Sequence, residues 1–385
     1  MKGDGFLRRL FLFAIILLIS YSSWSAYGKP SSYSEIKTAL ITIKDDLDSL
    51  KKNENITDFF QSLDMRMISL VQQLETKTDK LSKDQPEILF SVEKPKLKAP
   101  DKQAFSIYNI ELGDLRRDVE KQIGKPKRES FNEYGVKWYA YHENYQNFMM
   151  VAYNKKGKVA ALYTNNDLVT STKGISLGTE KDKVLNILGE PLSKIQKGLI
   201  YYQFQQNRDY DMFRLVGSYV TVFYDKHEDN TVTAIQIVDE HLEANKREFY
   251  TKASTKLKEG FEFQLFDLTN ATRVKHQLGI LNWDEHVKMT ARRHSNDMAE
   301  NNYFDHKNLK GQSPFDRMTE DNIIFTLAGE NLATGQFSSI FAHEGLMNSL
   351  GHRKNILKPG FENLGVGVAF NSKSQPYYTQ KYFTK

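Results

Sequence analysis

Three residues in the last third of the chain have side chains that could do chemistry together: His306, Glu330 and His352. His306 ends the aromatic stretch "NYFDH", and His352 stands in "NSLGHRKNIL" between a glycine and two basic residues. Glu330 lies in "AGENLA", which has few charges nearby, and a buried carboxylate is costly unless it is paired or hydrogen-bonded. Alone, His306 means little, because most histidines beside aromatic residues are structural, so the question is whether the fold brings the three together.

Two kinds of chemistry fit this set of side chains. Two neutral imidazoles and a carboxylate can hold a divalent metal such as zinc, with a bound water that could attack an ester or amide. Without a metal, a histidine–glutamate pair can act as a base and its orienting group. The chain has no cysteine, which excludes disulfides and cysteine-ligated metals. Ser349 is adjacent but stands in no recognised nucleophile motif, so we disfavour a role for it as nucleophile.

The elements that must position these residues can be read from the hydrophobic pattern. Apolar residues at helical spacing before His306 predict two helices, and Gly279 is expected to end the first. Asn282 or Asp284 would cap the second helix at its N-terminus. The alternating segments "NLGVGVAF" and "QPYYTQKYF" predict two strands that pair at the end of the chain. The inward face of the second helix is expected to consist of Val287, Ala291, Ser295, Met298 and Ala299.

An internal repeat precedes this unit. "IELGDLRRDVEKQIGKPKRE" begins at Ile110, and "ISLGTEKDKVLNILGEPLSK" begins at Ile175, an offset of 65 residues. Each copy predicts a strand end, a glycine turn, a short helix and a Gly-x-Pro stop, followed by strands with turns at 154–157 and 225–230. We therefore expect residues 105–240 to form one α+β domain of two similar halves. Its many aromatic residues are more typical of a core and sheet face than of a binding face.

The remaining segments concern location and partners. Residues 1–28 carry basic residues followed by an apolar run, which is typical of a secretory signal, and we favour an uncleaved signal anchor over a cleaved signal peptide. Residues 29–104 are interpreted as a helical spacer and a Lys/Pro linker, and 241–262 as a connecting helix. The protein is then expected at the cell membrane with its C-terminal domains outside, or secreted if the signal is cleaved. The net charge of +5 is spread along the chain without any nucleic-acid motif, so no nucleic-acid partner is expected.

Five motifs occur in order within residues 263–385: "HSNDMAENNYFDHK", "AGENLA", "MNSLGHRKNIL", "LGVGVAF" and "YYTQKYF". Together they resemble the CAP superfamily, the SCP-like extracellular domain, in its bacterial form. The Gly-x-Pro repeat domain is similar to the CAP-associated N-terminal domain that precedes such domains in Firmicute proteins. The resemblance implies an α+β protein whose C-terminal domain is an α-β-α sandwich with a central cleft. The repeat domain and an N-terminal helical anchor and spacer would precede that sandwich.

The family's cleft typically holds two histidines and two acidic residues. By motif, His306, Glu330 and His352 take three of these positions, as metal ligands or as catalytic groups. In the eukaryotic pattern the second glutamate lies three residues after a helix tryptophan. Here Leu346 replaces the tryptophan and Ser349 stands where that glutamate would be. The sequence therefore departs from the family's full set of four.

Further binding residues are expected around this set. His294 belongs to the bacterial motif and is expected to line or buttress the cleft, and Ser349 lies at its edge. Glu344 is near on the same helix, although it is expected to point elsewhere, and Gln380 of the final strand could point into the cleft.

The fold alone does not decide between functions. We favour an exported, membrane-tethered protein whose cleft binds an envelope lipid, polymer or protein. The alternative is a divalent-metal-dependent hydrolase or protease that uses the same cleft. Beside the site, Arg317 is expected to fix a loop by pairing with Asp316 or a backbone carbonyl. Arg353 and Lys354 are expected to form a solvated edge.

Overall fold

The computed structural model describes residues 92–206 and 208–385. The signal anchor predicted over 1–28 and the helical spacer predicted after it lie outside the described residues. Residues 92–104 form neither helix nor strand. Within the described ranges, no helix has both the length and the apolar character needed to cross a membrane.

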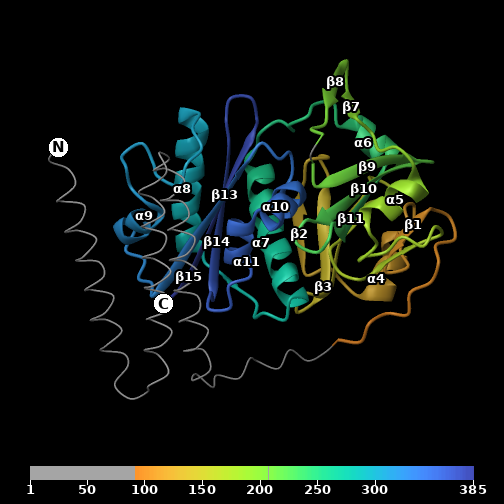
Figure 1. The fold of residues 1–385 in the computed structure, drawn as a ribbon, viewed down its shortest axis with the longest axis horizontal. Coiled ribbons are helices and arrows are strands. Elements are labelled where there is room, and N and C mark those ends of the chain that lie inside the picture. The colour runs from red at the N-terminus through yellow and green to blue at the C-terminus, as the bar shows by residue number, and fades with distance from the viewer. Residues whose placement is uncertain (1–91, 207) are drawn as a thin grey trace, which may run out of the picture. The chain divides into compact units, whose positions relative to one another are not determined.

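The first folded part, called here the repeat part, spans residues 105–239 and is built on an antiparallel sheet of seven strands (Figure 1). The strand order is β2-β3-β4-β5-β11-β10-β9, so the two copies of the repeat meet at the central pair β5 and β11. Two short helices and the small β1–β6 pair cover one face of this sheet. The elements are β1 (Phe105–Ile107), α4 (Arg116–Ile123), β2 (Arg128–Phe131), β3 (Lys137–Glu143), β4 (Gln146–Tyr153), β5 (Val159–Thr164), β6 (Val169–Ser171), α5 (Lys181–Leu188), β7 (Lys194–Lys197), β8 (Ile200–Gln203), β9 (Tyr210–Leu215), β10 (Ser218–Asp225) and β11 (Thr231–Asp239).

The predicted repeat is confirmed in its local geometry. Gly124 ends α4 with φ 81° and Gly189 ends α5 with φ 80°, a left-handed backbone that glycine adopts without steric cost. Val119 and Val184, one from each helix, are buried in the same hydrophobic core. The matching glycine, helix and Gly-x-Pro signals therefore produce two copies of one strand–helix unit.

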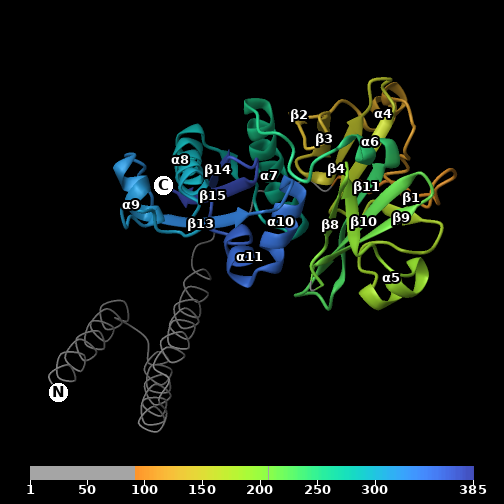
Figure 2. The same ribbon diagram turned by 90° about the horizontal axis from the view of Figure 1, so that it is seen from above.

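The second folded part, called here the C-terminal part, spans residues 255–385 and has three layers (Figures 1 and 2). Its sheet has the order β12-β14-β15-β13, with α8 on one face and α7 on the other. This arrangement confirms the predicted α-β-α sandwich. The elements are α7 (Thr255–Lys275), β12 (Asn282–Trp283), α8 (Glu285–Asn301), α9 (Pro314–Glu320), β13 (Leu327–Thr334), α10 (Ser339–Asn348), α11 (Leu350–Ile356), β14 (Asn363–Phe370) and β15 (Pro376–Thr384).

Helix α8 follows its sequence signals closely. The Asp284 side chain accepts a hydrogen bond from Val287 N at 2.8 Å and so caps the helix. The predicted inward face is buried throughout. The glycines of β14 let this helix lie directly on the strand, because a Cβ at Gly367 would stand 2.1 Å from the backbone nitrogen of Arg292.

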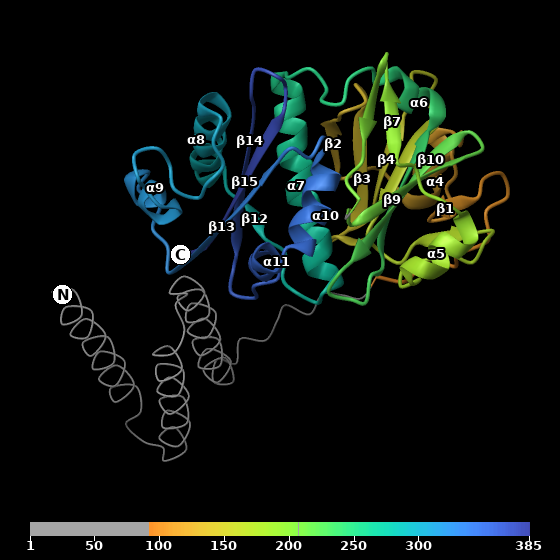
Figure 3. The ribbon, with the colours of Figure 1, turned by 45° about the horizontal axis from the view of Figure 1, so that its top comes forward.

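Helix α7 lies between the two sheets and contacts both of them (Figure 3). Gly260 permits this approach, since a Cβ there would stand 1.9 Å from the carbonyl oxygen of Phe131 in the repeat part. The structure thus has two helices where the sequence predicted one connecting helix over 241–262. These are α6 (Glu240–Asn245) and the start of α7, whose 21 residues run on to Lys275. One continuous hydrophobic core includes residues of both parts.

Candidate functional site

Glu330 is the centre of the candidate site, and strand β13 places its carboxylate in a buried position. Arg317 Nη2 lies 2.9 Å from Oε2 and 3.2 Å from Oε1 of this carboxylate. Lys381 is the residue opposite Glu330 in the β13–β15 register, and its Nζ lies 2.7 Å from Oε2. His306 Nδ1 completes the set at 3.0 Å from Oε1.

These partners determine the charge of Glu330. Burial acts to raise the pKa of the carboxyl group, but the hydrogen bond from His306 and the positive charges of Lys381 and Arg317 outweigh it. The pKa falls to about 2. The carboxylate is therefore ionised at neutral pH and accepts hydrogen bonds from all three partners.

His306 is the part of this cluster that solvent can reach, with 49% of its side chain exposed. An ionised carboxylate can only accept hydrogen bonds, so Nδ1 of His306 carries a proton and donates it to Glu330. In the neutral imidazole, Nε2 is then the nitrogen with the free lone pair. The loop between α8 and α9, which carries His306, is held by Arg317. Its Nη1 donates to the carbonyl oxygens of His306 at 2.8 Å and Gln312 at 2.9 Å.

His352 belongs to α11, which is fastened to β13 by amide side chains. Asn331 Nδ2 donates to the His352 carbonyl at 3.1 Å, and Asn355 Nδ2 donates to Asn331 Oδ1 at 2.9 Å and to the Glu330 carbonyl at 3.2 Å. Burial and the positive charge of His306 both lower the pKa of His352. The structure therefore joins His306 to Glu330 by a hydrogen bond, and it ties the helix that carries His352 to strand β13, which carries Glu330.

His294 contacts the backbone of the loop that carries His306. It is buried in α8, and its Nε2 lies 3.0 Å from the carbonyl oxygen of Asp305, the residue before His306. Burial lowers the pKa of His294 to about 4, so the ring is neutral at physiological pH. Ser349 is half-buried and joins α10 to α11 through its backbone, with its carbonyl accepting from Arg353 N at 2.8 Å.

Gln380 and Glu344 are not brought to the Glu330 carboxylate. Gln380 neighbours Lys381 in the strand and therefore faces the opposite side of the sheet, where its amide donates to Thr269 Oγ1 at 2.8 Å. Its carbonyl accepts from Asn331, so it stabilises the site only indirectly. Glu344 lies at the junction with the repeat part, where the Tyr163 hydroxyl donates to Oε1 at 2.6 Å.

The prediction that Arg353 lies at a solvated edge is wrong. Its side chain is buried, and Nη1 lies 2.7 Å from Asp225 Oδ2 at the end of β10. Beside it, Asn348 Nδ2 donates to the Tyr224 carbonyl at 2.8 Å. Helical geometry explains the difference, because neighbouring residues of α11 point to different sides. Lys354 is exposed as predicted.

Arg317 and Lys381 are the site residues that sequence reasoning missed. The predicted contact of Arg317 with backbone carbonyls is confirmed, but its second role as a partner of Glu330 was not foreseen. Lys381 carried a usable signal: a lysine inside the predicted apolar strand "YYTQKYF" must find a buried acidic partner.

The cluster does not fit the divalent metal that the sequence suggested. Among residues 92–206 and 208–385, no three histidine or acidic side chains are grouped so that they could hold a metal ion. Glu330 already has two cationic side chains against its oxygens, and they would repel a divalent cation. The donor set is that of a rigid hydrogen-bonding site.

Comparison with known protein families matches both folded parts. Residues 112–249 match the CAP-associated N-terminal family, and residues 266–382 match the Cysteine-rich secretory protein family, CAP. The uncharacterized membrane protein YlbC of Bacillus subtilis is 30% identical over 293 residues, which cover 71% of this chain and 82% of that protein. The uncharacterized protein YkwD of the same organism is 42% identical over 125 residues, which cover 32% of this chain and 48% of YkwD.

Solved structures show the same fold. A crystal structure of an extracellular protein with an SCP domain from Bacillus anthracis aligns with a TM-score of 0.62 at 24% identity, covering 76% of this chain and all of that one. A cysteine-rich secretory protein from Staphylococcus aureus aligns with a TM-score of 0.55 at 15% identity, covering 71% of this chain and 91% of that one. Despite having no cysteine, the chain therefore belongs to the cysteine-rich secretory protein (CAP) family, in the bacterial form with a CAP-associated N-terminal domain.

Proposed function

We propose that this chain is an exported, membrane-tethered protein of the cell envelope whose His306–Glu330–His352 site binds a polar group of an envelope ligand. The observation that carries this proposal is the state of Glu330, whose carboxylate is occupied by Arg317, Lys381 and His306. A carboxylate in this state orients an imidazole. It is poorly suited to hold a metal or to take a proton from a substrate.

The chemistry of the ligand follows from His306. Because Nδ1 is committed to Glu330, a ligand meets Nε2, which accepts a hydrogen bond when the ring is neutral. The complementary group is a hydroxyl or an amide N–H, which polysaccharides and peptides of an envelope polymer both present. The location of the relatives agrees with such a ligand, since one is named a membrane protein and another an extracellular protein.

The test is co-sedimentation of the purified full-length chain with isolated bacterial cell walls. We expect His306→Ala and His352→Ala each to weaken binding by about tenfold, the effect of losing one hydrogen bond to a desolvated partner. Glu344→Gln is the matched control, because this residue lies at the junction with the repeat part and should leave binding unchanged. Equal binding of the wild type and both histidine variants would contradict the proposal.

The hydrolase alternative is tested on the same samples. Zinc titration by calorimetry and an assay for soluble wall fragments are run on the wild type and on His306→Ala combined with His352→Ala. Zinc uptake together with fragment release, both lost in the double variant, would replace the binding role by metal-dependent hydrolysis. Binding without either signal would support the proposal.

A further inference from the structure

The second copy of the repeat contains a hairpin that the first copy lacks. The offset between the copies is 65 residues at the starts of α4 and α5, but it grows to 72 at the starts of β4 and β10. The offset is 66 residues from β2 to β7 and 73 from β3 to β9, so the added residues lie between the starts of β7 and β9 and include β8. In the described part of the chain β7 and β8 pair with each other, whereas β2 of the first copy joins the main sheet. At the tip of this hairpin Leu199 is 98% exposed, and Ile200 and Tyr201 are each 57% exposed.

A second exposed apolar residue lies in another turn that contacts the same helix. Val216, in the turn between β9 and β10, is also 98% exposed. Both turns contact the short helix α6: the Gly217 carbonyl accepts from Glu240 N at 3.1 Å, and Lys197 forms a buried ion pair with Glu243. These two points on α6 are about 5 Å apart at 1.5 Å of rise per residue, so the two turns are attached to the same short helix.

The hairpin that exposes these side chains is anchored to the rest of the fold. The buried ion pair of Lys197, the last residue of β7, fixes the hairpin next to its turn, and the ring of Tyr202 stacks on Phe249 with 4.9 Å between the ring centroids. Single exposed apolar residues are normal on protein surfaces, but a group of them on two anchored turns indicates a contact surface. Its small size argues against a protein partner, because stable protein interfaces bury about 800 Å² on each side.

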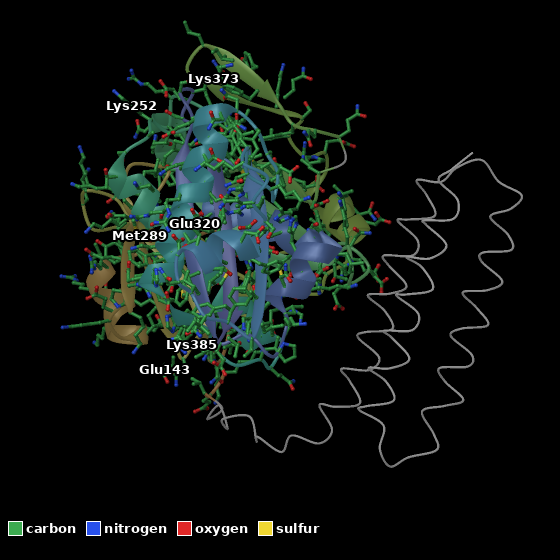
Figure 4. The ribbon with its side chains drawn as sticks, turned by 90° about the vertical axis from the view of Figure 1, so that its left-hand side faces the viewer. Glu143, Lys252, Met289, Glu320, Lys373 and Lys385 are labelled. Carbon is green, nitrogen blue, oxygen red and sulfur yellow. The ribbon has the colours of Figure 1, made fainter. Side chains whose placement is uncertain are left out.

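Basic side chains surround the apolar tips. Lys194 Nζ lies 4.7 Å from the centroid of the Tyr201 ring, and Arg214 and Arg247 are exposed. Lys252 and Lys373 are exposed and lie at the end of the molecule from which the hairpin projects (Figure 4). The same region also contains acidic residues, of which Glu240 lies 3.7 Å from Arg214 and Glu248 is exposed. Exposed apolar residues, a tyrosine and nearby lysine and arginine side chains are the residue types that bind an anionic membrane surface.

We propose that the β7–β8 and β9–β10 turns insert into the surface of an anionic lipid bilayer. In this arrangement the repeat part contacts the membrane through these two turns. Leu199 and Val216 enter the acyl region, Tyr201 lies at the level of the head groups, and the basic residues contact lipid phosphates.

The absence of cysteine from the chain gives a direct test. A fluorophore sensitive to polarity is attached to Leu199→Cys in the full-length protein, and to Lys121→Cys on the exposed face of α4 as the matched control. With vesicles containing phosphatidylglycerol, we expect the label at 199 to shift to shorter wavelength and its quenching by aqueous iodide to fall about threefold or more. The label at 121 should not change, and vesicles of phosphatidylcholine alone should have a smaller effect at 199.

A tether elsewhere in the chain brings the protein to the vesicle but does not bury position 199, so the full-length protein can be used. Equal iodide quenching of the two labels on anionic vesicles would overturn the proposal. Protection of 199 that appears without vesicles and rises with protein concentration would also overturn it, in favour of self-association. Adding Val216→Asp should restore most of the quenching at 199, and unchanged protection would contradict the joint surface. These outcomes do not depend on His306, so the proposed function is tested separately.

Discussion

Glu330 and Glu344 are both buried glutamates of the C-terminal part, yet their carboxyl groups are in opposite states. Arg317, Lys381 and His306 lower the pKa of Glu330 to about 2. At Glu344 burial dominates, and the pKa rises to about 7 even though the Tyr163 hydroxyl donates to the carboxyl group. Burial disfavours the charged form in both places, so the charge of the partners decides the sign of the shift.

The two environments serve different purposes. At Glu330 two buried cations and an anion form a rigid site next to an exposed histidine. Near Glu344 the positive charges of Lys275 and Arg353 are opposed by the negative charge of Asp225. Neutral polar groups also meet there: Asn165 Nδ2 donates to Thr272 Oγ1 at 3.0 Å, and this hydroxyl lies 2.7 Å from His343 Nε2. Burial lowers the pKa of His343 to about 3, so its ring carries no charge at neutral pH. The charged cluster holds the exposed His306 ring by a hydrogen bond, whereas the contacts around Glu344 join the two folded parts.

The largest expected effect is that of Glu330→Gln. This change leaves Arg317 and Lys381 charged and buried without their counterion, so we expect the free energy of unfolding to fall by about 3 to 5 kcal/mol. Urea denaturation at pH 8 measures it. Glu344→Gln is the matched variant: its amide oxygen still accepts from Tyr163, and at pH 8 it no longer buries a negative charge, so stability should be unchanged or higher. Equal losses in the two variants would contradict the comparison.

The next effect is the pH dependence of stability. Because the pKa of Glu344 is about 7 in the folded state and about 4.5 when unfolded, the folded state holds an extra proton between these values. Its contribution to stability is therefore present at low pH and is lost as the pH rises towards 7. Glu330 has the opposite sign, since its contribution is present above pH 4.5 and is lost as the pH falls towards 2.

We therefore expect the unfolding free energy of the wild type to fall between pH 5 and pH 8 by about 2 to 3 kcal/mol more than that of Glu344→Gln. Asp267 and Glu133 also have raised pKa values, of about 6 and about 7, so only the difference between the two proteins reports on Glu344. Denaturant titrations of both proteins at the two pH values measure that difference. Parallel profiles would show that Glu344 is ionised in the folded state.

Local signals in the sequence predicted much of this architecture. The glycines that end α4 and α5, the Asp284 cap and the inward face of α8 each depend on a few neighbouring residues, and all are confirmed. His306 and Glu330 could be predicted to lie together because each belongs to a motif that resembles the cleft residues of the family. The N-terminal anchor, which lies outside the described residues, and the domain limits stay predictions.

The rest depended on partners distant in the chain. Lys381 meets Glu330 only through the register of β13 and β15, and Arg353 meets Asp225, which lies 128 positions away. In "NSLGHRKN", Asn348 and Arg353 face the repeat part, while the backbone carbonyl of His352 accepts a hydrogen bond from Asn331 of β13. A short motif on a helix thus serves two surfaces, and its sequence alone does not say which residue faces which surface.

The smallest expected effect on stability comes from His306, a residue that we expect to contact the ligand. His306→Ala removes one hydrogen bond to Glu330, but Arg317 and Lys381 remain to neutralise the carboxylate. Because half of the His306 side chain is exposed, solvent replaces the lost partner, and we expect a loss of less than about 1 kcal/mol in unfolding free energy. The same variant should bind isolated cell walls about tenfold more weakly. A large loss of stability with unchanged binding would instead assign His306 to the structural network, and Glu330 would then differ from Glu344 only in its charge.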